Sequence, residues 1–250
     1  MTERKIKMHA KQAEALECLI GENGIREVLY GGAKGGGKSF LGCFWICSSA
    51  ILYPGTSWFI ARESLNDLRK HTMPSIFEVL RILDINQNLY KFNGQDNIFT
   101  FSNGSRIIFV SASYLPSDPM FERFGSMQNT GGFIEEGGEI NELAYSNLKL
   151  SIGRCMNKEY NLPFKLLITA NPKKNWMYRD FIKTITPDKK FIQAFAKDNI
   201  YLPEQYHATL ENIKDKQSRQ RLLLGDWDYD DDDNSLIPYN KIIDCFTNSF

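Results

Sequence analysis

Residues 31–39 of this chain read Gly31-Gly32-Ala33-Lys34-Gly35-Gly36-Gly37-Lys38-Ser39. From Gly32 onward they satisfy the pattern G-x-x-x-x-G-K-[ST], in which backbone N–H groups surround a polyphosphate at the N-terminus of a helix. The apolar run 28–30 predicts a short buried strand before this loop, and the run 40–47 predicts a largely buried helix after it. Because strand, loop and helix follow one another in this order, we expect the protein to bind a nucleoside triphosphate.

The loop also supplies charged and polar contacts. Lys38 is expected to reach the β and γ phosphates, and the Ser39 hydroxyl is expected to ligate Mg²⁺. Lys34 lies inside the loop, where it can touch phosphate from the same chain. The nucleotide-binding residues predicted in the loop are Gly32, Ala33, Lys34, Gly35, Gly36, Gly37, Lys38 and Ser39.

Composition and charge limit the classes of protein to which this chain can belong. With 250 residues, 42% of them hydrophobic, it can bury one large core. Its 30 basic and 30 acidic residues cancel, so any contact with nucleic acid must come from a local patch or another domain. The five cysteines show no C-x-x-C spacing and indicate free thiols in a reducing cytosol. We expect a soluble, cytoplasmic protein, because the sequence shows no signal peptide and no run of the ~18 apolar residues that span a membrane.

Strand and helix patterns alternate along the chain. Besides the helix after the loop, predicted helices cover residues 10–20, 65–83 and 140–155, and Pro74 is expected to break or kink the second of these three. Predicted strands cover residues 57–61, 98–101, 106–110, 132–134, 164–170 and 191–196. Asn103-Gly104 predicts a hairpin between two of these strands. The alternation predicts an α/β fold with a mostly parallel central sheet flanked by helices, and with the hairpin as an antiparallel addition.

Two adjacent carboxylates follow one of the predicted strands. Hydrolysis of a nucleotide needs a carboxylate near Mg²⁺, a base that orients water, and a cation for the developing charge. In the run Phe133-Ile134-Glu135-Glu136 we assign Glu135 to the metal and Glu136 to the attacking water. The alternative is a pair of surface glutamates that open a helix and complement its dipole.

Further candidates lie elsewhere in the chain. Thr169 and Asn171 lie at a predicted strand end, and we expect them to contact the γ-phosphate because the C-terminal ends of parallel strands meet at the phosphate site. An ordinary strand-to-turn ending is the alternative. Arg123 and Arg154 flank the glutamates, although a single arginine is by default a surface residue. Gln12, on the first predicted helix, lies where its amide could read the edge of adenine.

Taken together, these residues resemble the ATPase domain of the large terminase subunit of tailed bacteriophages, the motor that packages viral DNA. The resemblance covers nearly the whole chain and depends on the order and spacing of several short motifs. These motifs are Gln12, the loop 31–39, Trp58-Phe59-Ile60-Ala61-Arg62 followed by Leu68-Arg69, Arg123-x-Gly125, Phe133-Ile134-Glu135-Glu136, Thr169-Ala170-Asn171-Pro172 and Leu222-Leu223-Leu224-Gly225-Asp226-Trp227.

The resemblance implies a P-loop NTPase of the additional-strand catalytic-glutamate type, in which one strand is inserted between the two Walker strands. It implies ATP and Mg²⁺ as cofactors and Glu136 as the catalytic glutamate. Lys34 matches the basic residue inside the family's loop, and Arg123 matches an arginine that reaches the nucleotide of a neighbouring subunit. Glu135 departs from the family, because many members have Asp there, and its longer side chain leaves room for a water between carboxylate and metal.

The resemblance also implies partners and a location. Family members grip the phosphates of double-stranded DNA without reading its bases, and they dock on the portal protein as a ring of about five subunits. A small terminase subunit is a further implied partner. The implied location is the host cell cytoplasm, with transient docking at the portal vertex of the procapsid. The number of subunits in solution stays open.

Near its end the sequence changes character. The acidic run 226–233, which carries Trp227 and Tyr229, is interpreted as a solvated linker. We therefore predict an ATPase domain over residues 1–225, and a linker with the start of a further domain over residues 226–250. In the family a nuclease domain follows, so nuclease activity is expected only in a longer parent protein. Two alternatives stay open: a helicase or recombination ATPase on the same core, and an assembly module that binds ATP as a switch with little turnover.

Overall fold

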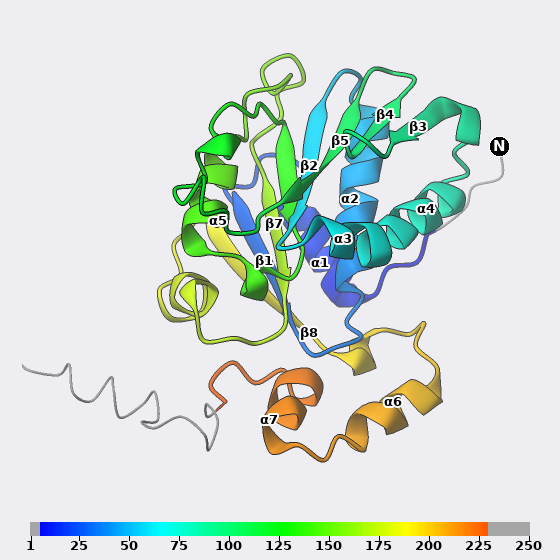
Figure 1. Cartoon of the computed structure of the whole chain (residues 1–250). Helices are drawn as coiled ribbons and strands as arrows, with labels where there is room; N and C mark the ends of the chain where they lie inside the picture. Colours follow the sequence, from blue (N-terminus) through cyan, green and yellow to red (C-terminus); the bar gives the residue numbers. More distant parts are fainter. Residues whose placement is uncertain (1–5, 230–250) are drawn as a thin grey trace, which may run out of the picture.

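The fold is built on one eight-stranded sheet, described by a computed structural model for residues 6–229 (Figure 1). The strand order is β3-β4-β5-β2-β6-β7-β1-β8. The strands are β1 Glu27–Gly32, β2 Ser57–Arg62, β3 Tyr90–Asn93, β4 Ile98–Phe101, β5 Arg106–Ser111, β6 Gly131–Ile134, β7 Leu166–Ala170 and β8 Lys189–Ala194. From β5 to β8 neighbouring strands pair in parallel, whereas β3, β4 and β5 pair antiparallel. The predicted α/β class, mostly parallel with an antiparallel addition, is confirmed.

Helices cover both faces of this sheet, as Figure 1 shows. On one face lie α1 Ala10–Leu19, α2 Lys38–Leu52 and α4 Met73–Ile82. On the other face lie α5 Glu142–Leu150 and a π-helical turn at Tyr178–Lys183. The shorter elements are α3 Leu65–Asp67, α6 Glu204–Glu211, α7 Lys216–Ser218, π-helical turns at Leu68–Thr72 and Arg219–Leu223, and 3-10 turns at Gln87–Leu89, Glu122–Phe124, Gly137–Glu139 and Ala196–Asp198.

The central strands bury side chains on both faces of the sheet, which is why they read as continuous apolar runs. In β2, Trp58 and Ile60 pack on the side of α2, whereas Phe59 and Ala61 pack on the side of α5. β7 lies between β1 and β6. One inserted strand therefore separates the strand before the phosphate loop from the strand before Glu135, and this arrangement confirms the predicted additional strand.

Pro74 does not break the helical segment predicted over residues 65–83. The segment runs as α3, a π-helical turn at Leu68–Thr72, and α4, with Pro74 in the first turn of α4. Proline has no N–H, and its ring clashes with the carbonyl four residues back, so a regular α-helix is unfavourable here. The chain accommodates the proline with a wider turn, in which the N–H of Met73 bonds to the carbonyl of Leu68.

Other predicted boundaries differ by a few residues. The helix predicted over 140–155 is α5, which begins after Asn141, whose side chain accepts a bond from the N–H of Leu143, and ends at Leu150. The strands predicted at 164–170 and 191–196 correspond to β7 and β8. The pattern did not predict β3, α6 or α7. β3 is a four-residue edge strand and the two helices are short, so each gives a weak periodic signal.

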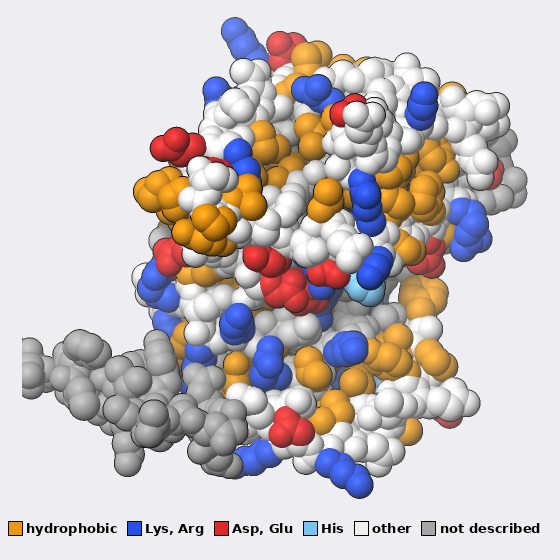
Figure 2. All heavy atoms as spheres, in the orientation of Figure 1, with side chains coloured by type: hydrophobic (Ala, Val, Ile, Leu, Met, Phe, Trp, Pro, Cys, Tyr) orange, Lys and Arg blue, Asp and Glu red, His pale blue; other side chains and the backbone are white. Residues whose placement is uncertain are grey.

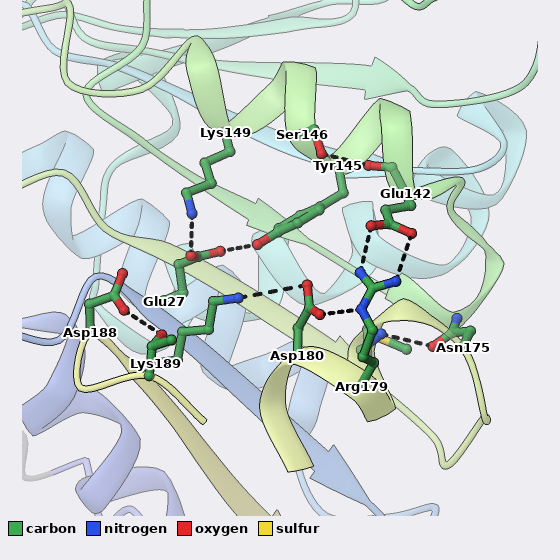
Figure 3. A network of polar contacts seen from close by, with 12 residues as sticks. Glu27, Glu142, Tyr145, Ser146, Lys149, Asn175, Arg179, Asp180, Asp188 and Lys189 are labelled. Carbon is green, nitrogen blue, oxygen red and sulfur yellow. Dashed lines mark hydrogen bonds and ion pairs between the residues drawn. The ribbon is translucent and has the colours of Figure 1, made fainter. Parts of the chain in front are cut away.

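A polar network ties α5 to the start of β1 (Figure 3). The side chain of Glu27 is fully buried, and its carboxylate accepts hydrogen bonds from the Tyr145 hydroxyl and the Lys149 ammonium. The Tyr145 ring stacks on Trp176 with centroids 4.2 Å apart. The network continues through ion pairs among Glu142, Arg179, Asp180 and Lys189, of which Glu142 and Arg179 form the exposed rim. The helix after the acidic pair is thus joined to the strand before the phosphate loop.

The chain still packs on the domain after residue 225. Trp227 and Tyr229 are buried. The Trp227 ring meets Phe191 edge-on at 5.5 Å, and a Cβ added to Gly31 would come within 2.6 Å of it. Trp227 and Tyr229 are therefore not part of a solvated linker. The domain boundary at residue 225 stays a prediction. Residues 230–250, which hold the rest of the acidic run, lie outside the described residues. Within residues 6–229, no helix combines the length and the apolar character needed to cross a bilayer.

Candidate nucleotide-binding site

The predicted phosphate loop connects the end of β1 to the start of α2. Gly32 has a φ of +130°, and a Cβ added there would lie 2.3 Å from the carbonyl oxygen of Ala194, so only glycine fits. Gly37 precedes α2 with a φ of +71° in the left-handed region and provides no side-chain cap. The first N–H groups of α2 are thus left without a capping side chain, as an anion site at a helix N-terminus requires.

Lys38 is buried and held by two acceptors. Its ammonium donates to the carbonyl of Ala33 at 2.8 Å and to the amide oxygen of Asn171 at 2.9 Å. Burial lowers the pKa of Lys38 to about 8, while the nearby charges of Glu136 and Glu135 act to raise it. Lys38 therefore lies between the loop and the ends of β6 and β7. A triphosphate would replace its neutral acceptors with charged oxygens.

Glu135 is a buried carboxylate at the end of β6, with 2% of its surface exposed. Its N–H donates to the carbonyl of Ala61 at 2.9 Å, and its carboxylate accepts a hydrogen bond from the Thr72 hydroxyl. Backbone and side chain are both fixed by neighbouring elements. The alternative of a solvated surface glutamate does not hold for this residue.

Glu136 makes different contacts from its neighbour. Its φ of +50° is uncommon for a residue with a Cβ, and such backbones cluster at functional sites. Its carboxylate accepts a hydrogen bond from the amide nitrogen of Asn171 at 3.3 Å. Burial raises the pKa of Glu136, and the charge of Lys38 opposes that rise. The two glutamates therefore occupy distinct environments, one anchored to Thr72 and one facing Asn171 and Lys38.

Asn171 bridges the basic and acidic sides of the site, because it accepts from Lys38 and donates to Glu136. Thr169, two residues earlier on β7, has a buried hydroxyl that finds no hydrogen-bond partner within residues 6–229. A buried polar atom without a partner is costly, and a phosphate oxygen would supply the missing acceptor. The structure thus brings Lys38, Glu136 and Asn171 together, with an unsatisfied hydroxyl on the same strand end.

The oxygen donors next to Lys38 fit magnesium better than a softer metal. Ser39, in the first turn of α2, offers a hydroxyl, and Glu135 offers a carboxylate. Mg²⁺ prefers such hard oxygen ligands, and it usually keeps several waters and binds substrate phosphates without an all-protein cage. The described residues 6–229 contain no cluster of three or more His, Cys, Asp or Glu side chains suited to a metal ion. The hydroxyl of Ser39 and the carboxylate of Glu135 are donors of the kind that Mg²⁺ prefers.

A cavity of about 770 Å³ opens beside the loop, with Gln12, Gly37 and Phe40 in its wall. The amide nitrogen of Gln12 donates to the carbonyl of Gly37 at 3.1 Å, and its oxygen accepts from the N–H of His9 at 3.4 Å. Gln12 is therefore tied to the end of the loop. The volume falls within the ~300–1,000 Å³ range of small-molecule sites, so the cavity has room for a nucleoside.

The other predicted cations contribute less directly to this cluster. Lys34 is exposed on the loop, and its charge adds to the lowering of the pKa of Lys38. Arg123 pairs with Asp118 at 2.7 Å, and its guanidinium lies over the rings of Phe121 and Phe124. Among the hydrogen bonds and ion pairs of residues 6–229, none joins Arg123 to the acidic pair. Figure 2 shows acidic side chains gathered at the centre of one face, with separate Lys and Arg side chains around them.

Two residues beside the acidic pair, Arg62 and Thr72, were not predicted from the sequence to belong to the site. Arg62 ends β2, pairs with Glu139 at 3.4 Å, and acts to lower the pKa of Glu136. Arg62 is the last residue of the strand motif quoted above. Because the C-terminal ends of parallel strands meet at the phosphate site, its place near the acidic pair could have been predicted from the sequence. Thr72, which contacts Glu135, gave no such signal, because helical periodicity does not show which distant side chain a residue meets.

The sequence matches the family described as "Terminase large subunit, T4likevirus-type, N-terminal" over residues 29–242. It is also 25% identical over 205 residues to the PBSX phage terminase large subunit of Bacillus subtilis strain 168. That match covers 74% of this chain and 45% of the relative, so the chain spans less than half of the relative's length.

Solved structures with a similar fold include phage large terminases. The large terminase of a thermophilic bacteriophage superposes with a TM-score of 0.73 at 15% identity, over 89% of this chain and 54% of that chain. The complex of the same terminase with ADP gives a TM-score of 0.70 at 15% identity, over 88% and 54% of the two chains. The ATPase domain of the Thermus phage P74-26 large terminase gives 0.60 at 14% identity, over 88% and 94%. Since the family match covers most of the sequence and the fold agrees, the chain belongs to the terminase large subunit family.

Proposed function

We propose that this chain is the ATP-hydrolysing motor domain of a viral terminase large subunit, which drives double-stranded DNA into a procapsid. The observation that carries the proposal is the contact of Asn171 with both Lys38 and Glu136. Through Asn171, Lys38, which is suited to hold phosphate, is joined to Glu136, which is suited to activate water. Hydrolysis requires both functions at one site, whereas nucleotide binding alone requires only the first. The ADP and ATP-γ-S complexes of the thermophilic bacteriophage terminase support ATP as the nucleotide.

In the proposed reaction, Lys38 exchanges the Ala33 carbonyl and Asn171 for oxygens of the β and γ phosphates. Glu136 accepts a hydrogen bond from the attacking water and orients it in line with the γ-phosphate. Asn171, once its bond with Lys38 is broken, and Thr169 donate hydrogen bonds to the γ-phosphate. The contacts at the end of β7 therefore change when the γ-phosphate binds and when it leaves.

The remaining contacts complete the proposed site. Ser39 and Glu135 would hold Mg²⁺, which neutralises charge on the β and γ phosphates. Gln12 is proposed to contact adenine in the adjoining cavity. Lys34 is proposed to contact phosphate in its own subunit, and Arg123 to reach the nucleotide of a neighbour.

Partners and location are proposed for the whole protein, because this chain spans 45% of its PBSX relative. The motor would act in the host cell cytoplasm as a ring docked on the portal protein, with a small terminase subunit as a further partner. Its grip on DNA would come from phosphate contacts, which carry no sequence information. The nuclease activity would belong to a longer parent protein.

Glu136→Gln tests the assignment of the base. We expect ATP binding to persist and turnover to fall by about 100-fold or more, because the water loses its base while the phosphate contacts remain. Lys38→Ala should weaken ATP binding itself. Calorimetry measures binding and phosphate release measures turnover. Glu159→Gln, at an exposed glutamate, is the matched control and should behave as the wild type. Wild-type turnover by Glu136→Gln would refute the assignment.

Translocation requires its own measurement, namely protection of duplex DNA from nuclease by purified procapsids in the presence of the parent protein and ATP. We expect Glu136→Gln to abolish protection. Protection that persists in this variant would contradict ATP-driven packaging. Hydrolysis that is stimulated by single-stranded DNA, but not by procapsids with duplex, would favour the helicase alternative.

A further inference from the structure

We infer that Thr72 is a positioning residue for Glu135, so that the π-helical turn at Leu68–Thr72 is part of the metal site. The inference rests on the proposed function, in which Glu135 contacts Mg²⁺. Thr72 would not touch the ion or the nucleotide. It would fix the carboxylate that does.

The contact lies entirely inside the protein. Thr72 is fully buried, Glu135 is 2% exposed, and the Thr72 hydroxyl donates to Oε2 of Glu135. A hydroxyl donor on one carboxylate oxygen fixes the rotation of the carboxylate plane and leaves the other oxygen for a further ligand. Metal ligands need this support, because a loosely held carboxylate samples orientations that do not bind the ion.

The backbone of Thr72 is also tied to the nucleotide side of the molecule. Its carbonyl accepts a hydrogen bond from the thiol of Cys43 at 3.8 Å, and Cys43 lies on α2, the helix that begins at Lys38. Thr72 therefore lies between the helix of the phosphate loop and the end of β6. A shift of either element would move the hydroxyl relative to Glu135.

The contact with Glu135 is made from the end of an irregular, wider helical turn. Pro74 makes a regular helix unfavourable, and the chain responds with the bond from the Met73 N–H to the Leu68 carbonyl. Thr72 is the last residue of that turn, where the helix changes its period and α4 begins. Single π-helical turns inside α-helices occur frequently at functional sites.

Thr72→Val, which keeps the shape of the side chain and removes the hydroxyl, is the test. The readout is the affinity of Mg²⁺ for the protein bound to ADP, measured by calorimetry in the full chain. We expect it to weaken by about 10–100-fold, as for other residues that orient metal ligands. Thr72→Ser, which retains the hydroxyl, should restore the wild-type affinity.

Thr56→Val is the matched control. Thr56 is equally buried, and its hydroxyl donates to the carbonyl of Tyr53 at 2.7 Å, away from the acidic pair. We expect this variant to lose stability without losing Mg²⁺ affinity, which separates a positioning role from general damage to the core. Thr72→Ala is measured alongside, because it removes the hydroxyl without placing a methyl group against the carboxylate, and it replaces the valine variant if that variant does not fold.

Glu135→Gln separates the inference from the proposed function. In the Glu135→Gln background, Thr72→Val should weaken Mg²⁺ binding no further, because Thr72 acts through the carboxylate. If Glu135→Gln weakens binding and the Thr72 variants do not, the positioning role is wrong and the metal role of Glu135 stands. If Glu135→Gln binds Mg²⁺ as the wild type does, the proposed metal role falls and the positioning role falls with it.

Discussion

A lysine buried beside two carboxylates responds to pH differently from a lysine on the surface. Burial lowers the pKa of Lys38 to about 8 in the nucleotide-free protein, although Glu136 and Glu135 act in the opposite direction. A bound triphosphate would raise that pKa again, because it places negative charge against the ammonium. At a pH between the pKa of Lys38 in the free protein and its higher pKa beside ATP, Lys38 must gain a proton when ATP binds. ATP affinity should therefore fall as the pH rises through about 8.

Calorimetry in buffers with different ionisation enthalpies measures this uptake directly. Well below pH 8, Lys38 carries its charge in both states, so no uptake at this residue is expected there, and the low-pH experiment serves as the internal control. An affinity that rises with pH through this range would contradict the assignment of Lys38 as the phosphate ligand.

At this scale, the sequence predicts residues whose role is local and misses those whose role depends on distant contacts. Lys38 and Ser39 follow from an eight-residue motif, and the acidic pair follows from its place after a strand. The contact between Lys38 and Asn171 joins residues 133 positions apart, and the strand-end argument predicted only that Asn171 would contact the γ-phosphate. Thr72 lies on a helix with no comparable argument, so its contact with Glu135 was found only in the structure.

Among the secondary-structure elements, α5 and β1 are coupled most directly through Glu27. Glu27→Gln would leave the Tyr145 hydroxyl and the Lys149 ammonium with a weaker, neutral partner in a buried position. We expect the free energy of unfolding to fall by about 1–3 kcal/mol. The loss should lie toward the lower end of this range, because the Lys149 ammonium is 34% exposed and can hydrogen-bond to water instead. Urea denaturation of the purified chain measures the difference.

The control for this prediction is Glu142→Gln on the exposed rim of the same network (Figure 3). Glu142 pairs with Arg179 at 2.6 Å, with side chains 50% and 56% exposed. An exposed pair of this kind contributes up to about 1 kcal/mol, so the loss should be smaller than for Glu27→Gln. Equal losses for the two variants would show that burial of Glu27 is not what gives the network its stability.

The elements predicted from the sequence were those with a strong periodic pattern. The buried parallel strands and α2 gave long apolar runs, whereas β3 pairs only at the sheet edge and shows a pattern of four residues. Pro74 was a correct signal of irregularity, because a π-helical turn interrupts the α-helical pattern just before it, although the segment does not end there. Whether a proline ends a helix or is absorbed by a wider turn depends on tertiary packing, here the burial of Leu68 and Thr72, which the local sequence does not contain.

For the whole molecule, the position of Arg123 bears on how subunits would work together. In its own chain Arg123 is held by Asp118 and lies over two phenylalanine rings, with no bond to Lys38 or Glu136 among the described residues. A closed ring with head-to-tail interfaces presents the same surface of each subunit to the site of the next. An arginine that makes no bond within its own site can complete a neighbour's site in such a ring.

Mixing two inactive variants tests this arrangement. Arg123→Ala should reduce turnover by roughly 10³-fold in assembled rings, because the developing charge on the phosphate loses its cation. Its own Glu136 and Lys38 remain intact, so a neighbour that carries Glu136→Gln can still supply the missing arginine. In equal mixtures about a quarter of the sites combine an intact base with a donated arginine, and turnover should recover toward that fraction of wild type. Mixing Glu136→Gln with Lys38→Ala should give no recovery, since both defects lie within a subunit's own site. Failure of the first mixture to recover, in rings shown to contain both variants, would place Arg123 outside the neighbour's site.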